Sequence, residues 1–276
     1  MSNNRAYILR LKIYQPQAHY RVPFTYKRRH TYPIPPYSTV IGFLCNVLGI
    51  DDQKKEEYQK LRAIKISIAG RFESKTTEYT WFRNLSKSAH AERFGSIDNR
   101  RIGGHVEHIG GQSPILIDVL NEVRLVIHLA HEDSSFVECI RSSLVNPVHR
   151  LEVLHLGRAE DWIVIEEPSE MLELSTFEIR RVDADFRHFF WVPERFYLPE
   201  PKDGASDLDR YEGLRYRLPT FWTVEDYATT RNRHGRRIFE YMTVKLSDGL
   251  FKEKKFLFDK ECNLPVFLAN FGGDHE

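Results

Sequence analysis

The chain has 276 residues, of which 41% are hydrophobic, so it can bury a sizeable core as one large domain or two small ones. No stretch approaches the roughly 18 consecutive apolar residues of a membrane span, and the first residues lack the apolar block of a signal peptide. We therefore expect a cytoplasmic protein with no membrane partner. The three cysteines are far apart and never in CxxC spacing, so we interpret them as small buried residues rather than as a disulfide framework or a metal site.

The net charge of +1 conceals an uneven distribution along the chain. Residues 1–50 contain no Asp or Glu, whereas the remainder has 33 Lys and Arg against 39 acidic residues. The seven cations of this segment are Arg5, Arg10, Lys12, Arg21, Lys27, Arg28 and Arg29. This asymmetry predicts a polyanion partner for the N-terminal part. The alternative is that these cations pair with acids from elsewhere in the fold.

The N-terminal part predicts a strand followed by a buried helix. Residues 5–14 (RAYILRLKIY) alternate in the manner of a strand covered on one face. Residues 39–48 are apolar nearly all round, with Ser38 placed as the N-cap and Gly49 as the residue that ends the helix in a left-handed conformation. The prolines before this helix hold the chain extended. We assign Gly42 to close packing of the helix against a sheet in preference to the alternative, an RNA contact.

The following segments predict an α+β fold. A charged helix is expected over 51–62, and residues 63–72 and 76–85 alternate as two strands of a hairpin. A strand over 121–131, a helix over 134–144 and a strand near 162–166 complete the order of a split βαβ, ferredoxin-like (RRM-like) sheet with helices on one face.

Two further segments complete the predicted organisation. Residues 83–114 hold many glycines and cations in loose order, which is typical of a functional insertion. The last hundred residues are rich in strand patterns and contain a polar loop at 199–213. We therefore predict a palm over 1–168 with a basic thumb at about 83–114, and a β-rich C-terminal extension over 169–276.

The chain lacks the common motifs of cofactor and metal enzymes. It contains no GxGxxG, GxxxxGK[ST], HExxH or GxSxG motif, so no cofactor is expected. The pairs His105/His108 and His128/His131 have no neighbouring acid or thiol at metal-ligand spacing, so no metal is expected either.

Cations and aromatic residues alternate in three stretches, 19–32, 82–105 and 230–241. Cations meet phosphates and aromatic rings stack on exposed bases, so this pattern favours single-stranded RNA as the partner. For any one stretch taken alone, a solvated charged loop is the simpler interpretation.

Three segments carry a resemblance to a known family: residues 5–14, residues 21–50 (RVPFTYKRRHTYPIPPYSTVIGFLCNVLGI) and residues 146–161 (NPVHRLEVLHLGRAED). They resemble the CRISPR-associated Cas-five family, the RAMP-type subunit of type I Cascade surveillance complexes, in particular type I-B. The resemblance implies an RNA-binding subunit that caps the 5′ handle of the CRISPR RNA and contacts the backbone and large subunits of Cascade in antiviral defence. Target DNA is then a partner only through the complex.

The resemblance also implies where the RNA lies. The handle site is placed at the turn before the buried helix, the cations upstream of it and the thumb. The RNA-binding residues implied are Arg21, Arg28, Arg29, Tyr37, Ser38, Thr39, Lys87, Arg93, Arg100, Arg101, His105 and His108. Arg158, in the LGR sequence, is interpreted first as a structural ion pair and second as an RNA or subunit contact.

The expected subunit is not an enzyme, and two alternatives are kept. One branch of the family, in type I-C systems, is a metal-independent endoribonuclease that processes repeat RNA. Such chemistry needs a base, an acid and a cation near the phosphate. The candidates for those roles are Tyr37, Lys87, His90, His105 and His108. The other alternative is a scaffold whose basic patches pair only with acidic partner subunits.

Overall fold

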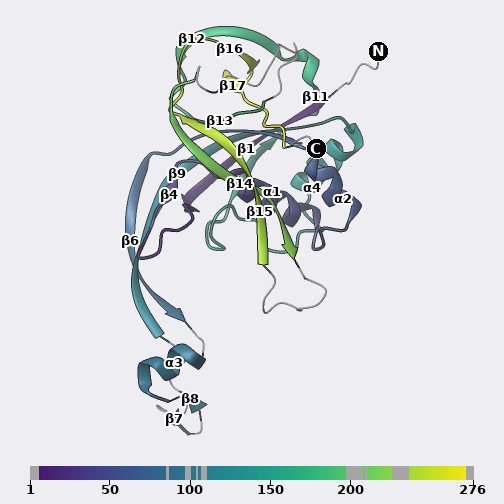
Figure 1. Ribbon diagram of the computed structural model, residues 1–276. Coiled ribbons are helices and arrows are strands. Elements are labelled where there is room, and N and C mark those ends of the chain that lie inside the picture. Colours follow the sequence, from purple (N-terminus) through teal and green to yellow (C-terminus); the bar gives the residue numbers. More distant parts are fainter. Residues whose placement is uncertain are drawn as a thin grey trace.

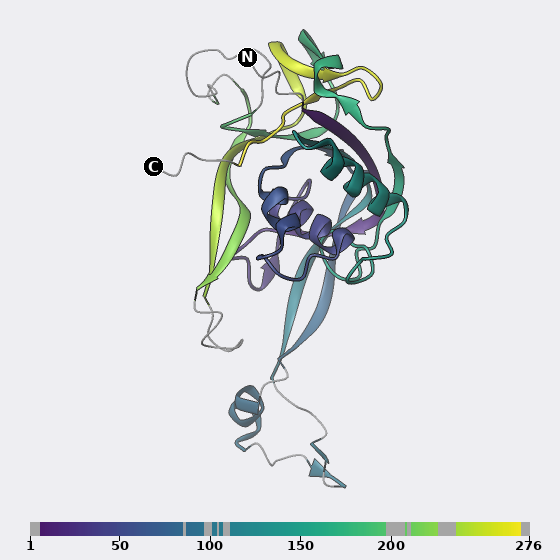
Figure 2. The same ribbon diagram turned by 90° about the vertical axis from the view of Figure 1, so that its right-hand side faces the viewer.

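The computed structural model describes residues 6–84, 87–96, 101–103, 105–106, 111–196, 208, 211–225 and 236–271. Its main feature is a long, curled antiparallel sheet with helices gathered on one face, inside the curl (Figures 1 and 2). The predicted mixed α and β fold is therefore confirmed at this level. Among the described residues, no helix is both long enough and apolar enough to cross a membrane.

Four strands and two helices form the centre of the molecule. The strands are adjacent in the order β10-β1-β9-β5, and every neighbouring pair is antiparallel. Helix α1 lies in the connection from β1 to β5, and α4 connects β9 to β10. Their bounds are β1 (Tyr7–Ala18), α1 (Tyr37–Leu48), β5 (Lys65–Arg71), β9 (Gly111–His131), α4 (Ser134–Val145) and β10 (Val164–Pro168). A second short helix, α2 (Glu56–Arg62), follows α1.

Helix α1 begins one residue after its prolines. Pro36, extended at φ −70° and ψ 160°, is the N-cap, and Tyr37 is the first helical residue. The prediction of Ser38 as N-cap was wrong, because a proline restricts the residue before it but leaves the residue after it free to become helical. The predicted end is confirmed: Gly49 is left-handed, at φ 69°.

The predicted hairpin of residues 63–72 with 76–85 was wrong in its pairing. Both segments are strands, β5 and β6 (Ser74–Asn84), but each pairs with β9 and neither pairs with the other. β9 has 21 residues, enough to serve both partners along one edge. The segment between them contains no Gly, Asn-Gly or Pro to reverse the chain, so the two strands follow one another along the same partner.

An arm projects from the body of the molecule (Figures 1 and 2). Strand β6 runs antiparallel to the first half of β9, from Ser74 opposite Asn121 to Asn84 opposite Gly111. Helix α3 (Lys87–Phe94) and the short strands β7 (Arg101–Ile102) and β8 (His105–Val106) lie at its far end. We call β6, α3 and the half of β9 that pairs with β6 the arm. It begins well before residue 83, the predicted start of the thumb.

The C-terminal part is rich in strands, as predicted. Three of its strands extend the main sheet in the order β5-β13-β15-β14, and three more form a separate sheet in the order β12-β16-β17. The bounds are β12 (Glu178–Asp185), β13 (Phe189–Pro193), β14 (Leu214–Glu225), β15 (Arg236–Ser247), β16 (Leu250–Asp259) and β17 (Leu264–Val266). Because β13 pairs with β5, one sheet crosses the predicted boundary at residue 168.

One hydrophobic core joins both parts of the chain. Leu9 of β1, Phe43 of α1, Ile140 of α4 and Trp191 of β13 belong to the same buried cluster. The cysteines depart from their predicted burial: Cys45 and Cys262 are partly buried, and Cys139 is exposed on α4.

Candidate nucleic-acid interface

Aromatic side chains hold the segment that leads into α1. Tyr32, from the short strand β4 (Thr31–Tyr32), packs edge-on against Trp191 of β13 and Tyr216 of β14, each at 5.7 Å between ring centroids. Trp191 and Tyr216 are 5.6 Å apart. Each such pair contributes about 0.5–1.5 kcal/mol beyond burial, so the C-terminal strands fix the position of the first turn of α1.

A pocket of about 410 Å³ lies at this first turn; we call it the basic pocket. It joins three segments that are distant in the sequence: the basic stretch near the N-terminus, the start of α1 and the LGR sequence. Its lining residues are His19, Tyr20, Arg21, Pro23, Arg29, Tyr32, Pro36, Ser38, Thr39, Gly157, Arg158 and Pro219. The structure thus brings together four of the predicted RNA contacts, namely Arg21, Arg29, Ser38 and Thr39.

Two cations of the basic pocket have no acidic partner among the described residues. Arg29, in strand β3 (Arg28–Arg29), lies over the ring of Phe82 at 4.7 Å, and Arg21 donates only to the main-chain oxygen of Thr25 at 3.3 Å. Burial, together with the like charge of Arg21, lowers the pKa of Arg29 from its usual value. Helix α1 has no acidic residue in its first turn and no side-chain cap. The positive end of its dipole is thus not neutralised by the helix itself.

The LGR sequence forms the opposite wall. Arg158 pairs with Asp161 at 2.8 Å, with Glu78 of the arm at 3.2 Å and with Glu160 at 3.4 Å, so the predicted structural ion pair is present. Gly157 has φ 109°, and a Cβ there would lie 2.7 Å from Asp161 Oδ2 and 2.8 Å from the His19 oxygen. Only glycine fits this position without displacing the wall.

Three buried polar atoms around the start of α1 lack a hydrogen-bond partner within the described part of the chain: His19 Nε2, Arg29 Nε and the Tyr37 hydroxyl. His19 is 3% exposed, and its Nδ1 is 2.7 Å from the main-chain oxygen of Asp118. A carbonyl only accepts, so Nδ1 carries the proton and Nε2 holds a free lone pair in the neutral ring. Burial lowers the pKa of His19 and keeps it neutral.

His19 was not among the predicted contacts, although it is the first residue of the basic and aromatic stretch 19–32. Its position depends on the carbonyl of Asp118, far along the chain, which no local pattern shows.

Arg28 faces away from the basic pocket and pairs with Asp118 at 3.2 Å. His30 and Thr77 also bind this carboxylate, at 3.0 and 3.1 Å. Burial alone would raise the pKa of Asp118, but the hydrogen bonds from His30, Thr77 and Arg28 outweigh it, and the pKa is lowered. Arg28 therefore anchors strand β3 to the arm, since neighbouring residues of a strand point to opposite sides.

Tyr37 does not fit its predicted role. Its side chain is 0% exposed and packs against Phe271 at 5.3 Å. Burial raises the pKa of its hydroxyl far above the usual value. A group enclosed in the core cannot contact RNA or exchange a proton with it, so the assignment of Tyr37 as a binding or catalytic side chain is corrected.

The predicted contacts of the thumb lie away from the basic pocket. Lys87, His90 and Arg93 belong to α3, at the far end of the arm from α1 (Figure 1). His90 is 2% exposed and packs against Phe94, with 4.7 Å between the ring centroids. For Arg101 and His105 only the backbone is described, in β7 and β8. Arg100 and His108 lie outside the described residues.

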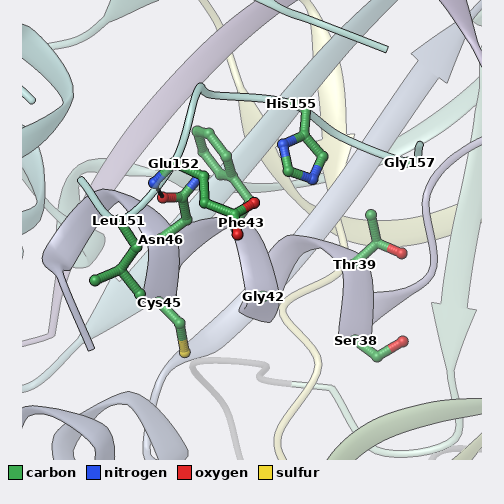
Figure 3. A pocket seen from close by; sticks show the side chains of 10 residues that line it. All are labelled: Ser38, Thr39, Gly42, Phe43, Cys45, Asn46, Leu151, Glu152, His155 and Gly157. Atoms are coloured by element: carbon green, nitrogen blue, oxygen red, sulfur yellow. Dashed lines mark hydrogen bonds between the residues drawn. The ribbon is translucent and has the colours of Figure 1, made fainter. Parts of the chain in front are cut away.

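A second pocket, of about 360 Å³, lies along α1 beside the basic pocket (Figure 3); we call it the helix pocket. It is lined by Ser38, Thr39, Gly42, Phe43, Cys45, Asn46, Leu151, Glu152, His155 and Gly157. Gly42 is exposed, and nothing lies within 4 Å of a Cβ placed on it. The prediction that Gly42 permits close packing on the sheet was therefore wrong: it faces this pocket.

Comparison with solved structures gives distant likenesses. A chain of a "CRISPR RNA-guided surveillance complex" has 13% identity and a TM-score of 0.47, covering 88% of this chain and 89% of the other. A "CRISPR protein from Archaeoglobus fulgidus" has 11% identity and a TM-score of 0.35, with coverages of 97% and 93%. A chain of a "Type III-B Cmr-beta bound to cognate target RNA" has 12% identity and a TM-score of 0.39, with 61% of each chain covered. No curated protein sequence matches the chain.

Comparison with protein families is more direct. The family described as "CRISPR-associated protein (Cas_Cas5)" matches residues 8–252. This match spans β1, α1, the arm, the LGR sequence and most of the C-terminal strands. The chain therefore belongs to the Cas5 family of CRISPR-associated proteins.

Proposed function

We propose that the basic pocket binds the 5′ handle of a CRISPR RNA, and that the chain is a non-catalytic subunit of a type I CRISPR surveillance complex in the cytoplasm. The observation that carries this proposal is the environment of Arg29, which lacks an acidic partner among the described residues. Its guanidinium rests on Phe82, beside Arg21, with no acidic partner among the described residues and with Nε buried and unpaired. Arg29 is partly buried, and a cation that has lost part of its hydration without gaining an acidic partner is suited to an anionic ligand.

The surroundings of Arg29 suit a phosphate in particular. The first turn of α1 has no side-chain cap and no acidic residue, so it supplies the N–H groups of Tyr37 and Ser38 and a partial positive charge. Ser38 and Thr39 add hydroxyl groups at the same edge of the pocket. An RNA phosphate placed there gains charge-assisted hydrogen bonds from groups that already stand in position.

The topology supports the proposed palm and thumb. The strand order β10-β1-β9-β5, with crossovers through α1 and α4, is the arrangement of a split βαβ sheet of the ferredoxin type. The arm, in the position of the proposed thumb, carries the exposed Tyr79 and Trp81, at 63% and 58%. We assign the arm and the exposed loop residues Phe24 and Tyr26 to contacts with the guide RNA and with the backbone and large subunits of the complex. Target DNA is then met through the guide RNA.

No observation favours the nuclease alternative. Its candidate acid, Tyr37, is enclosed in the core at the start of α1, whereas Lys87 and His90 lie on α3 at the far end of the arm. General acid–base cleavage needs these groups within hydrogen-bond reach of one phosphodiester. The described candidates do not meet that condition.

Binding of a fluorescent RNA oligomer from the host CRISPR repeat, measured by anisotropy over a range of salt concentrations, tests the proposal. We expect Arg29→Gln to weaken binding about tenfold or more and to reduce the slope of log affinity against log salt by about 0.7 for each phosphate that the variant no longer neutralises. Arg141→Gln removes an arginine of α4 that is paired with Glu138 at 3.0 Å, and should leave affinity and slope unchanged. Equal affinity and slope for the Arg29 variant and the unsubstituted chain would refute the proposal.

A further inference from the structure

The helix pocket offers a binding site next to the proposed phosphate site. We propose that it binds a single guanine base of the RNA, adjoining the phosphate in the basic pocket. This inference rests on the proposed function and adds base selectivity to it. It is carried by the adjacency of the two pockets, by Gly42 and by the acceptor groups of Glu152 and His155.

The two pockets lie next to each other at the start of α1. Ser38, Thr39 and Gly157 line both of them, so the base that adjoins a phosphate in the basic pocket is within reach of the helix pocket. The basic pocket adjoins the α1 N-terminus, and the helix pocket is lined by acceptor groups and by Phe43 and Leu151. A nucleotide has this same polarity, with an anionic phosphate at one end and a flat base with N–H donors at the other. A volume of about 360 Å³ is within the range of small-ligand sites.

Gly42 leaves the floor of the helix pocket open. It lies in the interior of α1, where glycine is less favourable than alanine. No neighbouring atom within 4 Å requires its small size, and its φ is not left-handed. The contacts within the chain therefore give no reason for glycine here. A flat ring lying on the helix backbone needs the absence of a Cβ at this point.

The loop over α1 directs hydrogen-bond acceptors into the helix pocket. Asn46 fixes this loop: its Oδ1 accepts from the Glu152 N–H at 2.8 Å, and its main-chain oxygen accepts from the Leu151 N–H at 3.1 Å. Figure 3 shows the Glu152 carboxylate and the His155 ring extending from the loop towards α1, on either side of Gly42.

Both acceptor groups are free to bind a ligand. The Glu152 carboxylate has no ion pair or hydrogen bond within the described part of the chain. His155 Nδ1 is 2.9 Å from the Val153 oxygen and donates to it, so Nε2 of the neutral ring is an acceptor.

This acceptor set selects among the bases. A carboxylate accepts two parallel N–H groups, and among the four RNA bases only guanine offers two adjacent donors, N1–H and the N2 amine, on its Watson–Crick edge. On the corresponding edges of adenine, cytosine and uracil each donor stands beside an acceptor, which the carboxylate repels. The Glu152 carboxylate therefore favours guanine over the other three.

The test compares RNA probes on the full-length chain by anisotropy. The probes are short oligoadenylates with one guanosine moved through each position, and the same set with inosine, which lacks the N2 amine. At one position we expect guanosine to bind about tenfold more tightly than inosine or adenosine, and Glu152→Gln to abolish this preference. 7-Deazaguanosine, which keeps the Watson–Crick edge, should bind like guanosine. Glu170→Gln, at an exposed residue paired with Arg141, should keep the preference.

A second variant separates binding from folding. Gly42→Ala should raise the melting temperature by about 2 °C, because alanine favours the helix, and should weaken binding of the guanosine probe several-fold, because its Cβ occupies the floor. Equal binding of guanosine, inosine and adenosine at every position, together with weaker binding by Arg29→Gln, would overturn this inference and leave the proposed function standing. Binding that is insensitive to Arg29→Gln would overturn the proposed function first.

Discussion

The indole Nε1 of Trp191 donates a hydrogen bond of 2.9 Å to the main-chain oxygen of Pro35. Trp191 belongs to β13 and is 0% exposed, whereas Pro35 lies two residues before the first turn of α1. A C-terminal strand thus satisfies a buried carbonyl in the segment that positions the basic pocket. The geometry of this pocket depends on residues more than 150 positions away along the chain.

Trp191→Phe keeps most of the buried ring but removes this donor. Because the Pro35 oxygen loses its partner, we expect the free energy of unfolding to fall by about 1–3 kcal/mol in urea titrations. Trp162→Phe, at a residue that is 52% exposed, is the matched control and should change it by less than about 0.5 kcal/mol. Equal stability of the two variants would show that the hydrogen bond contributes nothing.

Gly157→Ala places a Cβ against Asp161 and His19 at a left-handed backbone position. We expect a loss of about 1–3 kcal/mol in the free energy of unfolding, together with weaker RNA binding, because the wall of the basic pocket must move. Gly103→Ala is the comparison, since its φ is also positive, at 58°, but its surroundings are open. If the Gly157 variant lost no more stability than the Gly103 variant, the close contact would not constrain the wall.

Arg10 joins the main sheet to the second sheet through a buried ionic cluster. It pairs with Asp259 at 3.0 Å, with Glu167 at 2.8 Å and with Glu261, while His128 Nε2 lies 2.8 Å from Asp259. Burial alone would raise the pKa of Asp259, but His128 and Arg10 hold it far below its usual range. His128, Asp259 and Cys262 lie within 4.8 Å of one another, and the Arg10 guanidinium already supplies the positive charge that this group needs.

Arg10→Met leaves the Asp259 carboxylate buried without its cation, so we expect a loss of about 3–5 kcal/mol in the free energy of unfolding. Adding Asp259→Asn should recover part of this loss, because the uncompensated charge is removed. Arg124→Met, at the exposed pair with Glu166, should cost less than about 1 kcal/mol. If the losses in free energy of unfolding caused by Arg10→Met and by Asp259→Asn simply added in the double variant, the two residues would not be coupled and the cluster would not act as a unit.

Buried histidines should make the chain less stable in mild acid. Burial lowers the pKa of His19, His131 and His188 below the usual 6.5, so the folded chain binds fewer protons than the unfolded chain as the pH falls. The free energy of unfolding should therefore be flat above about pH 7 and decrease below pH 6.5, by up to about 1.4 kcal/mol per pH unit for each histidine. The lowered pKa values of Asp118 and Asp259 change the pH dependence of the free energy of unfolding only below about pH 4.

Urea titrations at several pH values measure this decrease, and His188→Gln should reduce it. A free energy of unfolding that stays constant between pH 7 and pH 5 would contradict the prediction.

The purified chain should not cut repeat RNA in the presence of a chelator. Tyr37 is enclosed, and Lys87 and His90 lie at the far end of the arm from it. A gel assay with end-labelled RNA measures this directly. Cleavage that persists in chelator and is lost in Lys87→Ala or His90→Asn, but kept in Arg93→Gln, would assign the chain to the nuclease branch.

Features of the fold that are set by neighbouring residues were predictable from the sequence. Helix α4 was expected over 134–144 and is found at Ser134–Val145, because the spacing of Phe136, Ile140 and Leu144 is a local property. The pairing of β6 was not predictable, because its partner is the distant first half of β9 and the pattern of residues 76–85 fits any antiparallel neighbour.

In the candidate site, too, local features could be predicted from the sequence and contacts between distant residues could not. The basic stretch and the proline-led helix could be located from composition and order. The distinct roles of Arg28 and Arg29 could not, because they depend on Asp118, which pairs with the first and not the second. The outward face of Gly42 and the position of His19 likewise depend on how α1 and β9 pack in three dimensions.

Strand β9 belongs to both the body and the arm. On one edge it pairs with β1 and then with β3, and on the other with β5 and then with β6. Its 21 residues span about 65 Å as a continuous element. Phe82 of β6 pairs with Ser113 of β9 towards the far end of the arm, and the guanidinium of Arg29 on β3 lies over its ring. A force applied at the tip of the arm therefore acts on the contact that holds the pocket cation, which makes the basic pocket mechanically sensitive to whatever the arm touches.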